Sequence, residues 1–165
     1  EGTLRDGFLR YKFEGRQWYA RQLGAWLAVT VRDKLTGKFD LVTWVPVSRK
    51  RRRTRGYDQA ELLCRSVSRA LGVPMARTLR KVTNNTAQST LQDAAMRAAN
   101  VRGVYQPYGP ETFQGKRLPL IDAIVTTGST LSECCRVLLT AGAQSVVCAA
   151  LATPRKNPEQ KGEPS

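Results

Sequence analysis

Histidine is absent from this 165-residue chain, and cysteine is sparse. Without an imidazole, the chain by itself cannot supply a Ser-His-Asp triad or a Cys-His pair, so both kinds of nucleophilic catalysis are excluded. The four cysteines (Cys64, Cys134, Cys135 and Cys148) include no C-x-x-C pair. Because structural zinc sites take their ligands in closely spaced pairs, we expect no protein-held metal. We interpret the cysteines as reduced structural thiols, with Cys148 packed as a small apolar residue.

Long apolar runs are also missing, since no segment approaches the roughly 18 residues of a membrane span. The opening EGTLRDGFLRYKFEG lacks the charged-then-apolar layout of a signal peptide. We therefore predict a cytoplasmic protein with no membrane span. The hydrophobic fraction of 41% fits one globular domain, which we place at residues 1–155. Residues 156–165 are polar and are predicted to be a disordered tail.

Acidic residues are half as common as basic ones. The chain has 27 Lys and Arg against 13 Asp and Glu, which gives a formal net charge of +14. Such a field attracts polyanions, namely nucleic acid, phosphorylated metabolites or acidic lipid surfaces. The alternative is that the charge serves only solubility.

The apolar pattern alternates between the periods of strands and helices. Helices are predicted over 16–33, 57–71 and 130–141, and strands over 39–47, 117–125 and 145–152. The residues expected to face the core are Trp18, Tyr19, Leu23, Trp26, Leu27 and Val31 in the first helix and Leu131, Cys135 and Leu138 in the third. TLSE at 130–133 predicts a capping box, with Thr130 as the N-cap and Glu133 reaching back. The succession predicts an α/β fold with a largely parallel sheet.

Residues 121–130, IDAIVTTGST, have the layout of a phosphate site. An apolar strand ends in Asp122, and a Thr-Thr-Gly-Ser-Thr turn opens a helix. The first N–H groups of a helix lack internal partners and carry partial positive charge, so a phosphate monoester fits there. In open α/β sheets such ligands lie at the carboxyl ends of strands. The alternative is an ordinary strand–helix turn with a Thr-rich cap.

Several stretches carry a family resemblance. LIDAIVTTGSTLSECCRVLLTAGAQSV resembles the phosphoribosyl-diphosphate motif of type I phosphoribosyltransferases. WVPVSRKRRRTRGYDQAELLCRSVSRAL, TAQSTLQDAAMRAANVRGVY and LRDGFLRYKFEGRQWYARQLG are similar, in chain order, to motifs of the ComF family. The likeness covers residues 4–155. It implies a Rossmann-like type I phosphoribosyltransferase fold, with a parallel sheet flanked by helices, a small hood and a flexible lid. Members usually carry a four-cysteine zinc module, which this sequence lacks.

The resemblance also implies roles for matching residues. Those implied to cradle the 5-phosphate are Thr126, Thr127, Gly128, Ser129 and Thr130, and Asp122 would contact the ribose as the catalytic candidate. Those implied to meet the diphosphate are Ser48, Arg49 and Arg55, and those implied for the lid are Gln88, Arg97 and Asn100. Residues 4–35 and 80–103 would build the hood over an acceptor. Mg²⁺ would accompany the diphosphate.

One acid of the family motif is missing, because Ala123 follows Asp122 where two adjacent acids are the rule. If both side chains faced the ribose, the loss would weaken binding and place phosphoribosyl transfer in doubt. Alternatively one acid suffices, because neighbouring side chains of a strand point to opposite faces.

The run RKRRRTR at 49–55 holds six positive charges, more than one diphosphate can use. We interpret it as a loop whose members partly face the pocket, while Lys50, Arg51, Arg52 and Arg53 contact a nucleic-acid backbone. The resemblance links the chain to competence and DNA uptake and implies a protein partner in that machinery. The favoured function is binding phosphoribosyl diphosphate or a nucleotide phosphate, with phosphoribosyl transfer as the implied activity. The alternatives are a non-enzymatic module for single-stranded DNA that kept the fold, and a ligand-sensing regulator.

Overall fold

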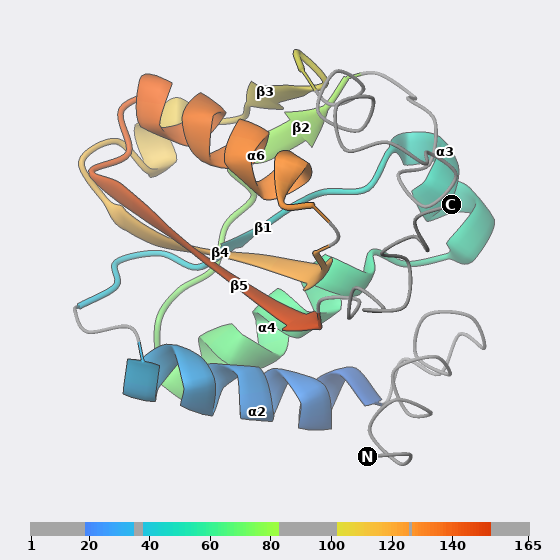
Figure 1. The fold of residues 1–165 in the computed structure, drawn as a ribbon, viewed down its shortest axis with the longest axis vertical. Coiled ribbons are helices and arrows are strands. Elements are labelled where there is room, and N and C mark those ends of the chain that lie inside the picture. Colours follow the sequence, from blue (N-terminus) through green and yellow to red (C-terminus); the bar gives the residue numbers. More distant parts are fainter. Residues whose placement is uncertain (1–18, 35–37, 83–101, 126, 153–165) are drawn as a thin grey trace, which may run out of the picture.

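Three parallel strands form the centre of the molecule. The computed structural model describes residues 19–34, 38–82, 102–125 and 127–152. The sheet order is β1 (Thr43–Trp44), β4 (Arg117–Ile124), β5 (Ser145–Ala152), and both neighbouring pairs are parallel (Figure 1). The predicted α/β fold with a parallel sheet is thus confirmed.

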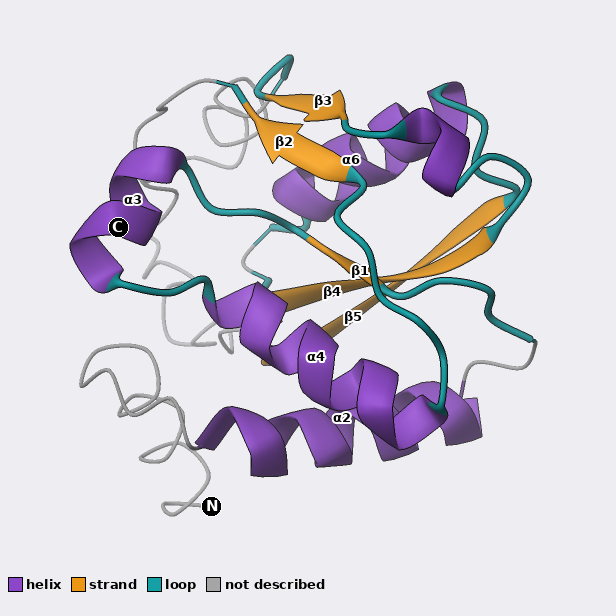
Figure 2. Ribbon diagram, turned by 180° about the vertical axis from the view of Figure 1, so that it is seen from behind, coloured by secondary structure: helices purple, strands orange, loops and turns teal. Residues whose placement is uncertain are grey.

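Helices cover both faces of this sheet. Helices α2 (Tyr19–Lys34) and α4 (Gln59–Leu71) lie side by side on one face, and α6 (Ser129–Thr140) lies on the other (Figures 1 and 2). A short antiparallel pair, β2 (Leu79–Lys81) with β3 (Tyr105–Pro107), stands beside α6. The remaining elements are the seven-residue helix α3 (Arg49–Arg55) and a 3₁₀ turn at Pro110–Thr112.

Because side chains point alternately to the two faces of β4 and β5, the core is divided into two clusters. The cluster under α2 and α4 receives Ile121 and Ala123 from β4, while the cluster under α6 receives Leu118 and Leu120. On β5, Ala149 packs with the first cluster and Val146 with the second. Because successive side chains of a strand point to opposite faces, β4 is buried on both sides.

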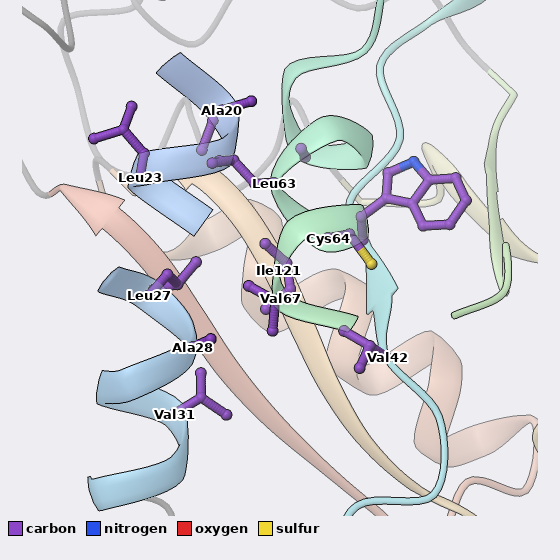
Figure 3. Close-up of a cluster of buried hydrophobic side chains, with 13 residues drawn as sticks. Ala20, Leu23, Leu27, Ala28, Val31, Val42, Leu63, Cys64, Val67 and Ile121 are labelled. Carbon is purple, nitrogen blue, oxygen red and sulfur yellow. The ribbon is translucent and has the colours of Figure 1, made fainter. Parts of the chain in front are cut away.

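Helices α2 and α4 approach each other closely. A Cβ on Gly24 would stand 2.3 Å from the Cβ of Ser66, a separation that real atoms do not adopt, so this position requires glycine. Figure 3 shows the core cluster to which both helices contribute; α2 supplies Ala20, Leu23, Leu27, Ala28 and Val31, and α4 supplies Ala60, Leu63, Cys64 and Val67. One face of α2 therefore belongs to the core. Most of the residues implied for the hood lie outside the described residues, so the hood stays a prediction.

Some sequence expectations for these elements were wrong. Trp26 is 56% exposed, because Ala28 and Leu27 complete the buried face of α2 without it. The strand expected over 39–47 is bonded as a strand only at β1, because Val42 forms a single bridge to Met75 and Pro46 cannot donate to a ladder. Trp18 lies outside the described residues, as does the side chain of Tyr19. In the part of the chain that the structure describes, no helix is long and apolar enough to cross a membrane.

The buried carboxylate of Asp58 joins the segment after β1 to the start of α4. Its Oδ1 accepts hydrogen bonds from the N–H groups of Ala60 (3.1 Å) and Glu61 (3.3 Å) and so caps α4. Its Oδ2 accepts from the N–H of Val47 (3.0 Å) in the segment that follows β1. One side chain therefore fixes both the start of α4 and the approach to α3.

We predict that Asp58→Ala lowers the free energy of unfolding by about 2–4 kcal/mol, because it removes a helix cap and leaves the Val47 N–H without its acceptor. Urea denaturation followed by circular dichroism measures the change. The control is Asp33→Ala, at an exposed aspartate of α2, which should change the stability by less than about 1 kcal/mol. Equal effects of the two variants would contradict the role of Asp58.

Candidate phosphate and ribose site

Several loops meet at one edge of the sheet. Since β1, β4 and β5 are parallel, their carboxyl ends lie on the same side, where α3 follows β1 and α6 follows β4 (Figure 1). Val45 N–H donates to the carbonyl of Ile121 (3.0 Å), so the end of β1 is held against β4 just before Asp122. This edge is where open α/β sheets bind ligands.

Helix α6 begins at this edge with a glycine. Gly128 is the N-cap, has a φ of 81°, and supplies no side chain to cap the helix. Thr127 Oγ1 and Ser129 Oγ lie 2.7 Å apart, and Ser129 N–H makes a long contact of 3.4 Å with Thr127 Oγ1. Thr130 is half-buried, and Thr126 lies outside the described residues. The predicted turn thus presents two hydroxyls and the uncapped start of a helix dipole to one place.

The expected capping box is wrong. Thr130 is inside α6 and not at its N-cap, and Glu133 is directed elsewhere. The Glu133 carboxylate accepts a hydrogen bond from Gly103 N–H (2.9 Å) and two from the Arg136 guanidinium (both 2.9 Å). The carboxylate that could have capped the helix therefore anchors the segment before β3, and the start of α6 stays open to a ligand.

Asp122 lies at the end of β4 on the face that α6 covers. Its side chain lies on the same face of the strand as those of Leu118 and Leu120, and it pairs in register with Ala150 of β5. Its Oδ1 accepts a hydrogen bond from Ala123 N–H (2.7 Å). Burial raises the pKa of Asp122 to about 6, although backbone N–H groups and Lys81 act in the opposite direction. A half-buried carboxylate at a strand end is suited to accept hydrogen bonds from ligand hydroxyls.

Ala123 faces away from this site. It is only 8% exposed and belongs to the core cluster of α2 and α4. The strand therefore sends Asp122 and Ala123 to opposite faces, which favours the interpretation that one acid serves the ribose side.

The basic run 49–55 is a helix and not the loop that we expected. Ser48 is the N-cap of α3, and its Oγ accepts a hydrogen bond from Arg51 N–H (3.3 Å). Gly56, with a φ of 79°, is the C-cap. Arg52 pairs with Glu61 (3.2 Å), and Arg55 donates to Gln59 (3.4 Å). These two contacts bind the helix to α4. Among the six cations Arg51 is half-buried, and Arg49, Lys50 and Arg53 are exposed.

Lys81 is a site residue that the sequence analysis missed. It ends β2, opposite Tyr105 of β3, and its Nζ lies 5.4 Å from the centre of the Tyr105 ring. Burial and the positive charge of Arg51 lower its pKa to about 8, while the charge of Asp122 acts in the other direction. Lys81 therefore lies within electrostatic reach of both Arg51 and Asp122. The pairing of β2 with β3, which flanks the expected lid, had no clear signal in the sequence.

The predicted lid residues Gln88, Arg97 and Asn100 lie outside the described residues, so their placement stays a prediction. Within the described ranges no group of three or more His, Cys, Asp or Glu could hold a metal ion. Any divalent cation at this edge would therefore depend on ligand oxygens together with Asp122.

Comparison with known proteins places this chain in a family. Residues 58–165 match the model of the phosphoribosyl transferase domain. Competence protein F of Haemophilus influenzae is 32% identical over 142 residues, which are 83% of this chain and 62% of that protein. DNA utilization protein YhgH of Escherichia coli is 33% identical over 107 residues, which are 65% of this chain and 46% of that protein. The chain thus spans less than two thirds of the length of these relatives.

A solved structure shares the fold. The chain superimposes with a TM-score of 0.54 on glutamine phosphoribosylpyrophosphate amidotransferase from B. subtilis, at 24% identity over 82% of this chain and 26% of that one. The chain belongs to the phosphoribosyl transferase domain family, and its likeness to Competence protein F supports the resemblance to the ComF family. The membership that the sequence motifs predicted is confirmed.

We predict that Ala123→Asp lowers the free energy of unfolding by about 1–3 kcal/mol and does not tighten binding of phosphoribosyl diphosphate, because the new carboxylate enters the apolar core. Urea denaturation and calorimetry measure the two effects. Ala25→Asp, at an exposed position of α2, is the matched control and should cost less than about 1 kcal/mol. Tighter binding by Ala123→Asp at unchanged stability would show that this position faces the ribose.

Proposed function

We propose that this chain binds phosphoribosyl diphosphate at the carboxyl edge of its sheet. The observation that carries the proposal is the gathering of three chemically distinct groups at that edge. They are the Asp122 carboxylate, the uncapped start of α6 at Gly128, and the Lys81 ammonium. These groups complement the ribose hydroxyls, the 5-phosphate and the diphosphate respectively.

Electrostatics at this edge favour a polyanion. Arg51 and Lys81 lie close enough for the first to lower the pKa of the second, so the two cations repel each other without a ligand. A bound diphosphate would relieve this repulsion and raise the pKa of Lys81. Mg²⁺ fits the same arrangement, since it is commonly held by one or two carboxylates together with phosphate oxygens and water. Asp122 would be its protein ligand.

The implied activity is phosphoribosyl transfer, in which diphosphate leaves as the acceptor attaches to the ribose. Arg51 and Lys81 would stabilise the charge that develops on the leaving diphosphate. The chain holds no histidine, so proton transfer from the acceptor would need another group.

We predict that isothermal titration calorimetry detects binding of phosphoribosyl diphosphate in the presence of Mg²⁺. The Asp122→Asn variant should bind it about 10- to 100-fold more weakly, because charge-assisted hydrogen bonds are lost. Binding of inorganic phosphate should change little, because backbone N–H groups hold it. Asp33→Asn, at an exposed aspartate of α2, serves as the control. Failure of the folded protein to bind phosphoribosyl diphosphate would overturn the proposal.

Lys81 gives the same experiment a pH dependence. The ammonium is charged below its pKa of about 8, so affinity for the diphosphate should fall as the pH rises through that value. The Lys81→Met variant should bind phosphoribosyl diphosphate more weakly at neutral pH, and its affinity should no longer depend on pH in this range. An unchanged profile in Lys81→Met would remove Lys81 from the site without affecting the assignment of Asp122.

A second candidate function, binding of single-stranded DNA, is favoured by the outward face of α3. Arg49, Lys50 and Arg53 are exposed on one short helix, and of its six cations only Arg52 forms an ion pair within the described residues. One relative is named a DNA utilization protein. An exposed basic helix beside a phosphate site can follow a nucleic-acid backbone through phosphate contacts.

We predict that the protein binds single-stranded DNA and that the slope of log K against log salt is about −2, since each of three neutralised phosphates contributes about −0.7. Lys50→Ala/Arg53→Ala should remove about 1.4 from that slope and leave binding of phosphoribosyl diphosphate unchanged. Arg21→Ala/Arg69→Ala, at exposed positions of α2 and α4, controls for net charge. A control variant with an equal effect would show that α3 is not the contact surface.

A further inference from the structure

Two thiols on neighbouring elements nearly touch. Cys135 of α6 and Cys148 of β5 have their sulfur atoms 3.1 Å apart, and both cysteines are free. Cys148 is exposed and Cys135 is half-buried. The expectation that Cys148 is packed as a small apolar residue is therefore wrong. Cys135 packs against the core cluster under α6, as expected, but it is only partly buried, whereas its neighbour Cys134 is fully buried.

The fold brings the two thiols together through the alternation of β5. Cys148 pairs in register with Leu120 of β4 and lies on the same face of β5 as Val146. Leu120 and Val146 both pack under α6. Cys148 therefore points toward α6, at the outer strand of the three-stranded sheet. On α6 the residue that meets it is Cys135. The pair is thus set by the packing of a helix on a strand and not by a flexible loop.

The contact makes the two thiols chemically unequal. A hydrogen bond from Cys148 lowers the pKa of Cys135, because it stabilises the Cys135 thiolate, whereas the same contact raises the pKa of Cys148. Cys64 and Cys134 differ from both, since each is fully buried and burial raises the pKa of its thiol. Reactivity toward oxidants follows thiolate character and access, so it should be confined to the Cys135–Cys148 pair.

We propose that Cys135 and Cys148 form a reversible oxidation site that peroxides convert to a disulfide. The Cys135 thiolate attacks one oxygen of hydrogen peroxide; the O–O bond breaks, the second oxygen leaves as water after taking a proton, and Cys135 becomes a sulfenic acid. The Cys148 sulfur then attacks the Cys135 sulfur, the S–O bond breaks, and a second water leaves. Two thiols are oxidised and one peroxide is reduced to two waters.

The disulfide would tie α6 to β5. A disulfide needs its sulfur atoms about 2.05 Å apart, so the two sulfurs must approach by about 1 Å from their present contact. Helix α6 carries the Gly128 turn at its start, so the bond would fix the helix that presents the candidate phosphate site. Closing the chain between residues 135 and 148 restricts the unfolded state, and the Tm should rise by about 5–10 °C.

Peroxide treatment followed by trypsin digestion and mass spectrometry tests the proposal. Cleavage after Arg136 separates Cys134 and Cys135 from Cys148, so the disulfide joins peptides 118–136 and 137–155. We expect this linked pair, with the mass of two hydrogens lost, reversal by dithiothreitol, and Cys64 unmodified. An oxidised protein without the linked peptides, or a linkage only between two chains on non-reducing gels, would overturn the proposal.

Two variants assign the roles. Cys148→Ser should leave the Cys135 sulfenic acid unresolved, so dimedone should label peptide 118–136. Cys135→Ser should give neither a linked pair nor a dimedone adduct, although it keeps Cys134 on the same peptide. A linked pair in Cys135→Ser would show that Cys134 is the partner and would refute the assignment. Thermal melts of oxidised and reduced wild type, with oxidised Cys148→Ser as the control, then measure the Tm shift.

Discussion

The double burial of strand β4 is the constraint on which the rest of the structure depends. It is hydrogen-bonded to β1 on one edge and to β5 on the other, and its two faces supply two separate apolar clusters. Because side chains alternate along a strand, the register that buries Ile121 under α4 also directs Asp122 toward α6. A slip of one residue would bury the carboxylate in the α2–α4 core, so the core itself fixes the position of the acid.

The chemistry proposed for this edge would depend on charge and not on a nucleophile. In this chain without histidine, Arg51 and Asp122 both act electrostatically on Lys81, and α6 begins at the uncapped Gly128 six residues after Asp122. In the proposed function such groups would position and neutralise a phosphorylated ligand, which is the main task in reactions where diphosphate leaves. The cations of α3 serve different ends, since Arg52 and Arg55 attach the helix to α4 and Arg51 approaches Lys81.

Helix α6 connects the two proposals about this molecule. Its first residues form the candidate phosphate turn, and Cys135 in its second turn contacts Cys148 of β5. Chemistry at the thiols would act on the same rigid element that carries the turn, without touching Asp122. The thiol pair lies outside the candidate site, so variants at Cys135 and Cys148 can be tested for redox behaviour independently of ligand binding.

Local pattern in the sequence was sufficient to predict the long elements and the glycine turn between β4 and α6. The strands at 117–124 and 145–152, the helices ending at Gly72 and before Gly142, and Asp122 beside Gly128 all follow from apolar periodicity and turn chemistry. What the tertiary structure decided were partners distant in sequence. The contacts of Glu133 with Gly103 and of Cys135 with Cys148, and the electrostatic effect of Arg51 on Lys81, join separate elements. Periodicity identifies the face on which a side chain lies, but only the packing of one element against another determines which group it meets there.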